Sequence, residues 1–515
     1  MTSKRESFPG ATNPQSNGNE SSLITVIDGT REARKLIHTM QKISYPAVFV
    51  ILACFLNCVN VQAAEADKPQ TPNIILILAD DLGYGEIGPF GQQHILTPNL
   101  DRMAIEGMRF TQHYSGSTVC APSRVSLLTG KNTGNVRIRG NGNFPMDDEE
   151  VTLAEILKPA GYATAVIGKW DSGEIGSTGD PLNQGFDYQF GYMHQIDAHN
   201  FYPDHLWRNG QRVDLDNEVF VVERGYARGK GTYSTVRNEY SHDLFMEDAF
   251  SWITDHQDQP FFLFLPLTIP HANNEHYNSP DEHGMEVPDL HPYEDRDWPT
   301  VQKATAAMVT RMDTGIGELM RLLKSLGIAE NTLILFTSDN GPHQEGGNQL
   351  EFFDTNGPLR GMKRDLYEGG IRVPFLAWWP GTISPGKTSE HISAFWDYLP
   401  TFADLSGQPM TSETNGISFL PTLLGEKQKA HEYLYWEFIE GPGTQAVRWG
   451  PWKAIRTRVH GYGFEAQLEL YNLDEDPGET ANLAYDRPDK VEEAKAILSR
   501  ARVPSDLFKF SFERN

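Results

Sequence analysis

Several side chains that can bind cations stand directly after apolar segments of the sequence. Asp80 and Asp81 follow one such run, and Asp339 and Asn340 follow another. Ligands of open α/β sheets bind outside the carboxyl ends of the strands, so these residues stand where a site is expected. Carboxylate and amide oxygens suit hard cations such as Ca²⁺. Either pair alone is better explained as a helix cap or a solvated turn, but two pairs on one sheet favour a metal site.

A lysine and a histidine follow two further apolar runs. Lys169 stands in Gly-Lys-Trp after the run at 163–167, and His271 stands in Pro-His after the run at 261–265. A purely structural explanation would need four independent coincidences at four strand ends. We therefore interpret the acidic, amide, lysine and histidine side chains as members of one site.

Cys120 lies in Ser-Thr-Val-Cys-Ala-Pro-Ser-Arg, which continues as Val-Ser-Leu-Leu-Thr-Gly. Pro122 suits the first turn of a helix and Gly130 suits its end, so the pattern predicts a helix that begins near Cys120. Free N–H groups at that end stabilise negative charge, and Arg124 lies on roughly the same helix face. Cys120 is the one cysteine that would remain after removal of the N-terminal signal described below. A single cysteine either fills space in the core or is reactive, and these neighbours favour a reactive group.

Buried strands alternating with helices are expected to position these groups. The predicted strands are 73–79, 163–167, 261–265, 332–337 and 373–378. The predicted helices between them include 100–106, 151–158 and 301–326. This order predicts an α/β fold whose large domain has a mostly parallel, mixed sheet sandwiched by helices.

The pattern of predicted secondary structure changes after Gly407. Short predicted strands, separated by turn residues, lie at 433–438, 445–449, 452–456 and 468–472. One predicted helix follows at about 490–500. We therefore expect a catalytic domain at 70–410 and a small C-terminal subdomain at 411–515, built from an antiparallel sheet and one helix.

The motifs around these residues resemble those of type I sulfatases, the arylsulfatase A-like members of the alkaline phosphatase superfamily. The likeness extends from about Pro72 to Leu483. It includes DDLGYG at 80–85, TPNLDRMA at 97–104, CAPSRVSLLTG at 120–130, GKW at 168–170, PH at 270–271, TSDNG at 337–341, PLRGMKRDLYEGGIRVP at 358–374 and ELYNLDEDPGETANLA at 469–484. The Cys-x-Pro-Ser-Arg string is highly specific to this family.

The resemblance implies an alkaline-phosphatase-like fold and a function for each matched residue. It implies conversion of Cys120 to Cα-formylglycine by a formylglycine-generating or anaerobic sulfatase-maturing enzyme. It implies one Ca²⁺ ion, with a ligand set of Asp80, Asp81, Asp339, Asn340 and the modified Cys120. It further implies Arg124 beside the aldehyde hydrate, Lys169 and Lys363 on the sulfate oxygens, and His271 as the acid for the leaving alcohol.

One position departs from the family pattern. Many sulfatases read Gly-Lys-Trp-His, whereas Asp171 follows Gly-Lys-Trp in this sequence. A second anion beside bound sulfate would repel it, so either Asp171 points away or another residue takes the role of the histidine. We hypothesise that His199 is the substitute; the alternative is that His199 is structural or contacts the sugar.

Composition limits the partners. The chain has 515 residues and a formal net charge of −25, which argues against nucleic acid or an anionic membrane as the main partner. An anionic substrate would need a local cationic pocket. Sulfated carbohydrate is therefore expected to bind where Lys and Arg residues gather near the motifs.

The N-terminal segment predicts export. Residues 1–39 are interpreted as a disordered leader or a mis-assigned start, and 40–64 as a signal peptide with an apolar stretch at 47–59. Cleavage would remove Cys54 and Cys58, leave no stable membrane span and place the protein in the periplasm or outside the cell. A membrane anchor or a lipoprotein signal is the weaker alternative.

The sequence therefore predicts hydrolysis of sulfate esters on sulfated carbohydrate. Two alternatives remain: a phosphonate or phosphate monoester hydrolase, because related folds use similar metal sites, and a non-catalytic protein that binds sulfated glycans. Only Asp171 favours the binding protein, since the other predicted site residues are all retained.

Overall fold

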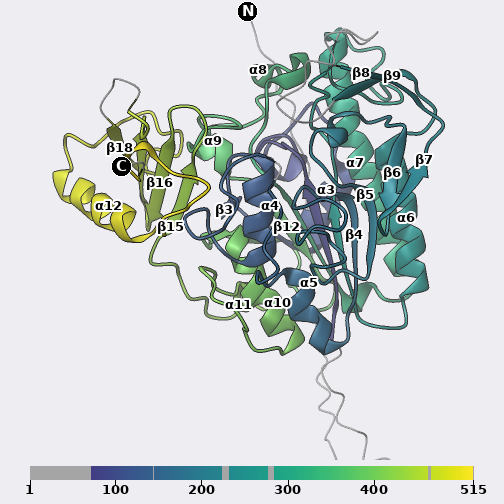
Figure 1. Cartoon of the computed structure of the whole chain (residues 1–515), viewed down its shortest axis with the longest axis horizontal. Helices are drawn as coiled ribbons and strands as arrows, with labels where there is room; N and C mark the ends of the chain where they lie inside the picture. The colour runs from purple at the N-terminus through teal and green to yellow at the C-terminus, as the bar shows by residue number, and fades with distance from the viewer. Residues whose placement is uncertain (1–70, 143, 223–230, 276–282, 462–465, 514–515) are drawn as a thin grey trace, which may run out of the picture. The chain divides into compact units, whose positions relative to one another are not determined.

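The computed structural model describes residues 71–142, 144–222, 231–275, 283–461 and 466–513 (Figure 1). The leader and signal peptide predicted at 1–64 lie outside these ranges. Within them, no helix has both the length and the apolar character needed to cross a membrane.

Four parallel strands form the centre of the main sheet. β1 (Asn73–Ala79) is buried at every position and lies between β10 (Phe261–Pro266) and β11 (Thr332–Ser338), both parallel to it. β4 (Ala163–Lys169) pairs with the other side of β10. These segments are mostly apolar because both faces of the sheet are covered. The predicted mostly parallel sheet is confirmed.

Shorter strands extend the sheet to ten strands in the order β13-β2-β12-β11-β1-β10-β4-β5-β6-β7. They are β2 (Met108–Phe110), β12 (Phe375–Trp378) and β13 (Lys387–Ser389) on one side, and β5 (Tyr188–Tyr192), β6 (His205–Arg208) and β7 (Gln211–Asp214) on the other. β12 runs antiparallel to β11, and β6 runs antiparallel to β5, so the sheet is mixed at its edges.

Helices cover both faces of the sheet. One apolar cluster joins Ile75 and Ile77 to α3 (Pro98–Glu106), α6 (Ser241–Asp255) and α7 (Thr300–Ser325). The opposite cluster joins Ile74 and Leu76 to α4 (Cys120–Thr129), α5 (Leu153–Leu157) and α10 (Tyr398–Ser406). Side chains of a strand alternate between faces, which explains why neighbouring residues of β1 belong to different clusters.

Smaller elements complete the large domain. They are the strand pairs β3 (His113–Tyr114) with β14 (Ser393–Ala394) and β8 (Glu218–Val221) with β9 (Thr232–Val236), and the single-turn helices α8 (Leu350–Phe353), α9 (Glu368–Ile371) and α11 (Leu420–Leu423).

The C-terminal part forms a separate antiparallel sheet with one helix, as predicted. The sheet has the order β15 (Leu434–Phe438), β16 (Thr444–Trp449), β17 (Trp452–Thr457) and β18 (Gln467–Asn472), and α12 (Pro488–Arg500) packs on it. Lys453 of β17 lies 2.9 Å from Glu368 of α9 and 2.9 Å from Glu479, with all three side chains buried. This ion-paired cluster joins the small sheet to the segment that follows Lys363.

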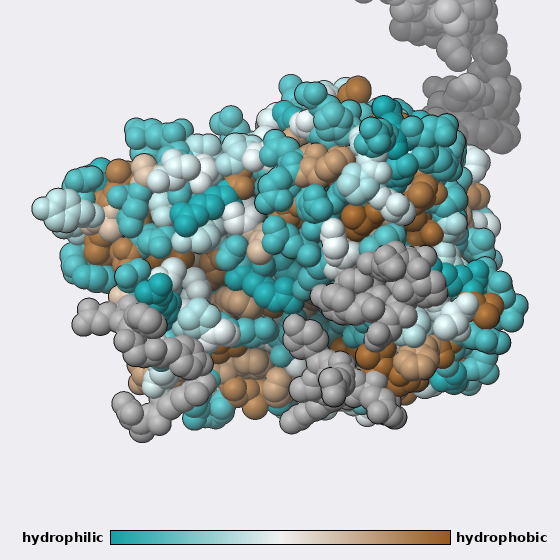
Figure 2. Space-filling view, turned by 90° about the horizontal axis from the view of Figure 1, so that it is seen from above, coloured by the Kyte–Doolittle hydropathy of each residue, from teal (hydrophilic) through white to brown (hydrophobic). Residues whose placement is uncertain are grey.

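The face seen from the top of Figure 1 is mostly hydrophilic, with hydrophobic residues in separate patches (Figure 2). This agrees with the excess of acidic over basic residues, 69 to 44.

Candidate active site

Cys120 is the first residue of α4, as the sequence predicts, and Gly130 ends that helix in a left-handed conformation (φ 67°). The thiol is buried, with its Sγ 3.6 Å from Asp80 Oδ1. Burial raises the pKa of the Cys120 thiol well above its ordinary value. A thiol that stays protonated is a poor nucleophile, so the unmodified side chain is not suited to attack an ester.

The four acidic and amide residues meet because β1 and β11 are neighbouring parallel strands in register. Ala79 lies opposite Ser338, so the residues that follow each strand come together. The backbone N–H of Asp81 donates to Asp339 Oδ1 at 3.0 Å, and Asn340 Nδ2 donates to Asp81 Oδ1 at 2.6 Å. Asp81 adopts a left-handed conformation (φ 64°), which bends the chain directly after the strand.

Several side chains of this group lie close enough together to hold a metal ion. Single ligand atoms of Asp80, Asp81, Cys120 and His271 all lie within 4.8 Å of one another. Burial and the neighbouring Asp80 carboxylate together outweigh the charge of Arg124 and raise the pKa of Asp339 to about 7. Asn340 Oδ1 is buried without a hydrogen-bond partner among the described residues. A cation would relieve both conditions.

Three basic side chains surround the same carboxylates. Lys169 Nζ lies 2.8 Å from Asp80 Oδ2, and Lys363 Nζ lies 2.8 Å from Asp81 Oδ2. Arg124 binds Asp339 Oδ2 through Nε at 3.1 Å and Nη2 at 2.9 Å. All three are buried. Three basic side chains are thus gathered beside Cys120, although each of them is paired with a carboxylate.

His271 lies beside one of these lysines. Its Nδ1 hydrogen-bonds the carbonyl of Ala272 at 2.7 Å, which leaves Nε2 directed at Lys363 Nζ, 3.1 Å away. Burial, together with the Lys363 charge, lowers the pKa of His271 to about 3. The ring is therefore neutral at rest, with Nε2 able to accept a proton.

His199 and Asp171, the two residues discussed for the missing family histidine, are both buried. His199 stacks on His271, with ring centroids 5.0 Å apart and planes 12° from parallel, and its Nδ1 lies 3.1 Å from Glu275 Oε2. Asp171 adopts a left-handed conformation (φ 60°), and its Oδ2 has no hydrogen-bond partner among the described residues. Burial raises the pKa of Asp171 above its ordinary value, because removal from water disfavours the charged carboxylate.

Three site residues escaped the sequence argument. Glu345 Oε2 lies 3.1 Å from Lys363 Nζ, Glu275 holds His199, and the His343 ring stacks 5.7 Å from that of His271. His343 and Glu345 closely follow the Asp339 motif, so their nearness in the chain was a usable signal. Nothing in the sequence pairs Glu275 with His199, because 76 positions separate them.

Family models match both parts of the chain. The model described as Sulfatase matches residues 72–408, and the model described as N-sulphoglucosamine sulphohydrolase, C-terminal, matches residues 361–502.

Individual relatives match over most of their length. An N-acetylgalactosamine-6-O-sulfatase of Bacteroides thetaiotaomicron is 31% identical over 513 residues, covering 86% of this chain and 95% of that protein. Arylsulfatase A of Homo sapiens is 34% identical over 463 residues, covering 82% of this chain and 85% of that protein.

Solved structures show the same fold. One, described under the metabolism of multiple glycosaminoglycans by Bacteroides thetaiotaomicron, has a TM-score of 0.68 and 28% identity, covering 84% of this chain and 99% of that chain. Another, described as Ps i-CgsB in complex with k-i-k-neocarrahexaose, has a TM-score of 0.68 and 26% identity, covering 84% and 92%.

Proposed function

Since this chain belongs to the sulfatase family and is a sulfuric ester hydrolase, we propose that it removes sulfate from a sulfated carbohydrate by means of a formylglycine derived from Cys120 and a bound Ca²⁺. The observation that carries the proposal is the meeting of Lys169, Arg124 and Lys363 around three carboxylates beside Cys120. A sulfated sugar is proposed because one relative is named an N-acetylgalactosamine-6-O-sulfatase and one similar structure holds the oligosaccharide k-i-k-neocarrahexaose.

The nucleophile requires a change at Cys120. Oxidation of its side-chain carbon to an aldehyde by a dedicated maturation enzyme, followed by hydration, supplies an attacking hydroxyl and a second hydroxyl that allows sulfate to leave. The raised pKa of the buried thiol supports this proposal, because the thiol itself is held in its unreactive form. Its position at the start of α4 places the reacting atom at a helix end that favours negative charge.

Ca²⁺ is proposed to bind Asp80, Asp81, Asp339 and Asn340 together with the modified Cys120. The ion supplies a Lewis acid that stabilises negative charge on oxygen. Asp339, Asp80 and Asp81 each contact a basic side chain, namely Arg124, Lys169 and Lys363 in that order. Those basic side chains are then available to the substrate when the ion neutralises the carboxylates.

The basic side chains hold the sulfate and the leaving group. Lys169 and Lys363 are proposed to bind the sulfate oxygens, and Arg124, fixed by its bond to the Lys169 carbonyl at 2.7 Å, to face the nucleophile. His271 is proposed to protonate the leaving alcohol through Nε2. Bound sulfate, as an anion nearby, would raise the pKa of His271 from its low resting value and favour the protonated ring.

The ester specificity is tested by comparing the wild-type rates on N-acetylgalactosamine 6-sulfate and N-acetylgalactosamine 6-phosphate. We expect kcat/KM to be higher for the sulfate, because the carboxylates of Asp80, Asp81 and Asp339 offset the charge of the three basic side chains and disfavour a phosphate dianion more than a sulfate monoanion. A higher value for the phosphate would instead identify a phosphate monoester hydrolase. The glycan-binding alternative predicts turnover of neither ester.

His199 is proposed to assist release of sulfate in place of the family histidine. Replacing it with alanine should then lower kcat by ~10²-fold with little change in KM, the size of a lost general acid or base. Steady-state kinetics on the same sulfate ester measure both constants. His205→Ala, which removes a histidine of the neighbouring strand β6, is the matched control.

A rise in KM with an unchanged kcat would show that His199 contacts the sugar instead. Asp171→Asn tests, in the same assay, whether Asp171 rather than His199 assists release of sulfate. A loss of kcat in Asp171→Asn but not in His199→Ala would assign the proton transfer to the buried Asp171 carboxyl group.

Export is proposed from the signal sequence predicted at 40–64. Release of the protein without a membrane anchor would bring the site to sulfated polysaccharide outside the cytoplasm.

A further inference from the structure

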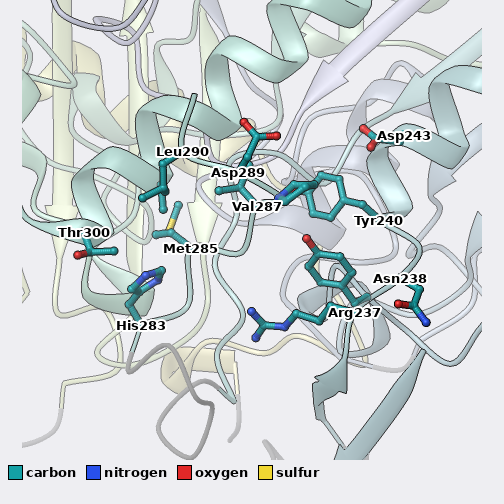
Figure 3. A pocket seen from close by; sticks show the side chains of 13 residues that line it. Arg237, Asn238, Tyr240, Asp243, His283, Met285, Val287, Asp289, Leu290 and Thr300 are labelled. Carbon is teal, nitrogen blue, oxygen red and sulfur yellow. The ribbon is translucent and has the colours of Figure 1, made fainter. Parts of the chain in front are cut away.

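One cavity of the protein is lined by residues outside the candidate active site. It has a volume of about 440 Å³ and is formed where the starts of α6 and α7 meet the segment 283–290 (Figure 3). Cavities of this size are in the range that holds small ligands. None of the residues that line it has a part in the sulfate chemistry above.

The cavity lies at the same edge of the sheet as Cys120. α6 leads into β10 and α7 leads into β11, and both strands are parallel to β1. The helices therefore run opposite to the strands, so their first residues lie near the strand ends that carry the candidate active site. Thr300 is the first residue of α7, and Tyr240 immediately precedes α6.

Two chain segments connect the cavity to the active site. Tyr202 lines the cavity three residues after His199, whose ring stacks on His271. Met285 lines it next to Gly284, which is hydrogen-bonded to Asn273, two residues after His271. The two segments are joined by a bond from the Phe201 N–H to Glu286 Oε2 at 3.1 Å.

The walls combine apolar, aromatic and polar groups. Figure 3 shows Met285 and Leu290 on one side and Tyr240 on the other, while Arg237 extends toward the side that His283 occupies. Carbon-rich faces beside hydrogen-bonding groups suit a sugar ring, which offers C–H patches and hydroxyls together.

The basic side chains at the cavity are each paired with acidic ones. Arg237 lies 3.1 Å from the buried carboxylate of Glu286. Arg311 binds Asp243 through two nitrogens, at 2.7 and 2.5 Å, and lies 3.4 Å from Asp289. The three carboxylates outnumber the two guanidinium groups, so a second sulfate would meet net negative charge, whereas an uncharged ring would not be repelled.

We propose that this cavity binds an uncharged sugar residue, a hexose or an N-acetylhexosamine, of the same glycan that carries the scissile sulfate. This inference rests on the proposed function for the nature of the glycan. The protein then recognises a chain of several sugars rather than a single sulfated one, and the cavity contributes to affinity for oligosaccharides alone.

Filling the cavity tests the proposal. Thr300 is exposed and lies one helical turn from Ala304, which also lines the cavity, so Thr300→Trp places an indole there without removing a buried contact. Arg321→Trp adds the same side chain to an exposed position ~30 Å further along α7 and is the matched control. Unchanged melting temperatures would show that both variants are folded.

The probe is neocarrahexaose from κ-carrageenan, in its sulfated form and in a chemically desulfated form that the sulfate site does not recognise. Calorimetry should show wild type binding the desulfated hexasaccharide, and Thr300→Trp binding it at least about tenfold more weakly, a loss of about 1.4 kcal/mol. Arg321→Trp should bind it as wild type does. Binding that is absent in wild type, or equal in wild type and Thr300→Trp, would overturn the proposal.

Sulfate release separates this outcome from failure of the proposed function. We expect Thr300→Trp to lower kcat/KM for the sulfated hexasaccharide by about tenfold and to leave N-acetylgalactosamine 6-sulfate or 4-nitrophenyl sulfate unaffected. If wild type released sulfate from the small esters but did not bind the desulfated chain, only the cavity proposal would be wrong. If wild type released sulfate from none of the esters, the proposed function would fail as well, and the cavity proposal with it.

Discussion

Replacing Cys120 with alanine is expected to abolish sulfate release, with a loss in kcat of about 10⁵–10⁶-fold, the size seen when a catalytic nucleophile is removed. Alanine lacks the thiol of Cys120, so its side chain cannot be converted to formylglycine. The substitution removes one buried sulfur atom at the start of α4, and the melting temperature should change only slightly. Release of sulfate from a small aryl ester, measured beside wild type, gives the comparison.

Mass spectrometry of wild-type protein from its own host shows whether the nucleophile forms. Trypsin should release residues 110–124, which contain Cys120 and end at Arg124. Conversion to formylglycine lowers the mass of this peptide by about 18 Da. The variant Ser126→Ala changes a residue of α4 that lies outside this peptide. Prepared in the same way, it should show the same loss of mass and so controls for changes introduced during preparation. An unmodified thiol in fully active protein would contradict the mechanism.

Removing the metal should reduce both activity and stability. Without a cation, Asp80, Asp81 and Asp339 lie together in a buried site. Loss of the ion is expected to lower kcat by ~10²–10³-fold, as when a preorganised charge at the reacting group is removed. A ligand present at a hundred times its Kd adds about 2.7 kcal/mol of stability, so we also expect a melting temperature lower by ~5 °C. Dialysis against chelator and calorimetric melting measure both effects.

The stability effect should depend on pH. In metal-free protein the pKa of Asp339 is raised to about 7 from an ordinary value of 3.8, by burial and by Asp80. A group whose pKa is higher in the folded state stabilises the fold below its unfolded pKa, and this stability is lost as the pH rises through the folded pKa. The difference in melting temperature between Ca²⁺-loaded and metal-free protein should therefore widen from pH 5 to pH 8.

Two controls show whether the loss of activity and stability is caused by removal of Ca²⁺ from this site. Added Ca²⁺ should restore activity and melting temperature, whereas Mg²⁺ should restore less because it requires a stricter octahedral geometry. Asp339→Asn should lose the response to Ca²⁺, and Asp506→Asn, at an exposed position far along the chain, should keep it. Full activity in thoroughly chelated protein would rule out a metal role.

Much of the site could be predicted from the sequence because its residues stand at fixed places on regular elements. An apolar run followed by Asp80-Asp81, and another followed by Asp339-Asn340, place those side chains at strand ends whatever the rest of the fold does. Pro122 and Gly130 likewise fix the extent of the helix that begins at Cys120. The predicted strands, the mixed sheet and the small C-terminal sheet follow from the same local patterns.

The edges of the sheet were less predictable. β2, β13 and the pair β6 and β7 are short, and several of their positions face solvent. Such strands have neither a continuous apolar run nor a long alternation, and their pairing depends on neighbours elsewhere in the chain. Their existence and order became known only from the fold.

The sequence by itself determined which residue types stand at the strand ends and at the start of α4, because propensity and hydrophobic period act over a few neighbouring positions. Only the tertiary structure decided which acid meets which base, that His199 stacks on His271, and that Asp171 is buried with a raised pKa. These contacts join segments separated by tens to hundreds of positions. They are set by strand register and by burial of charge, which no local pattern records.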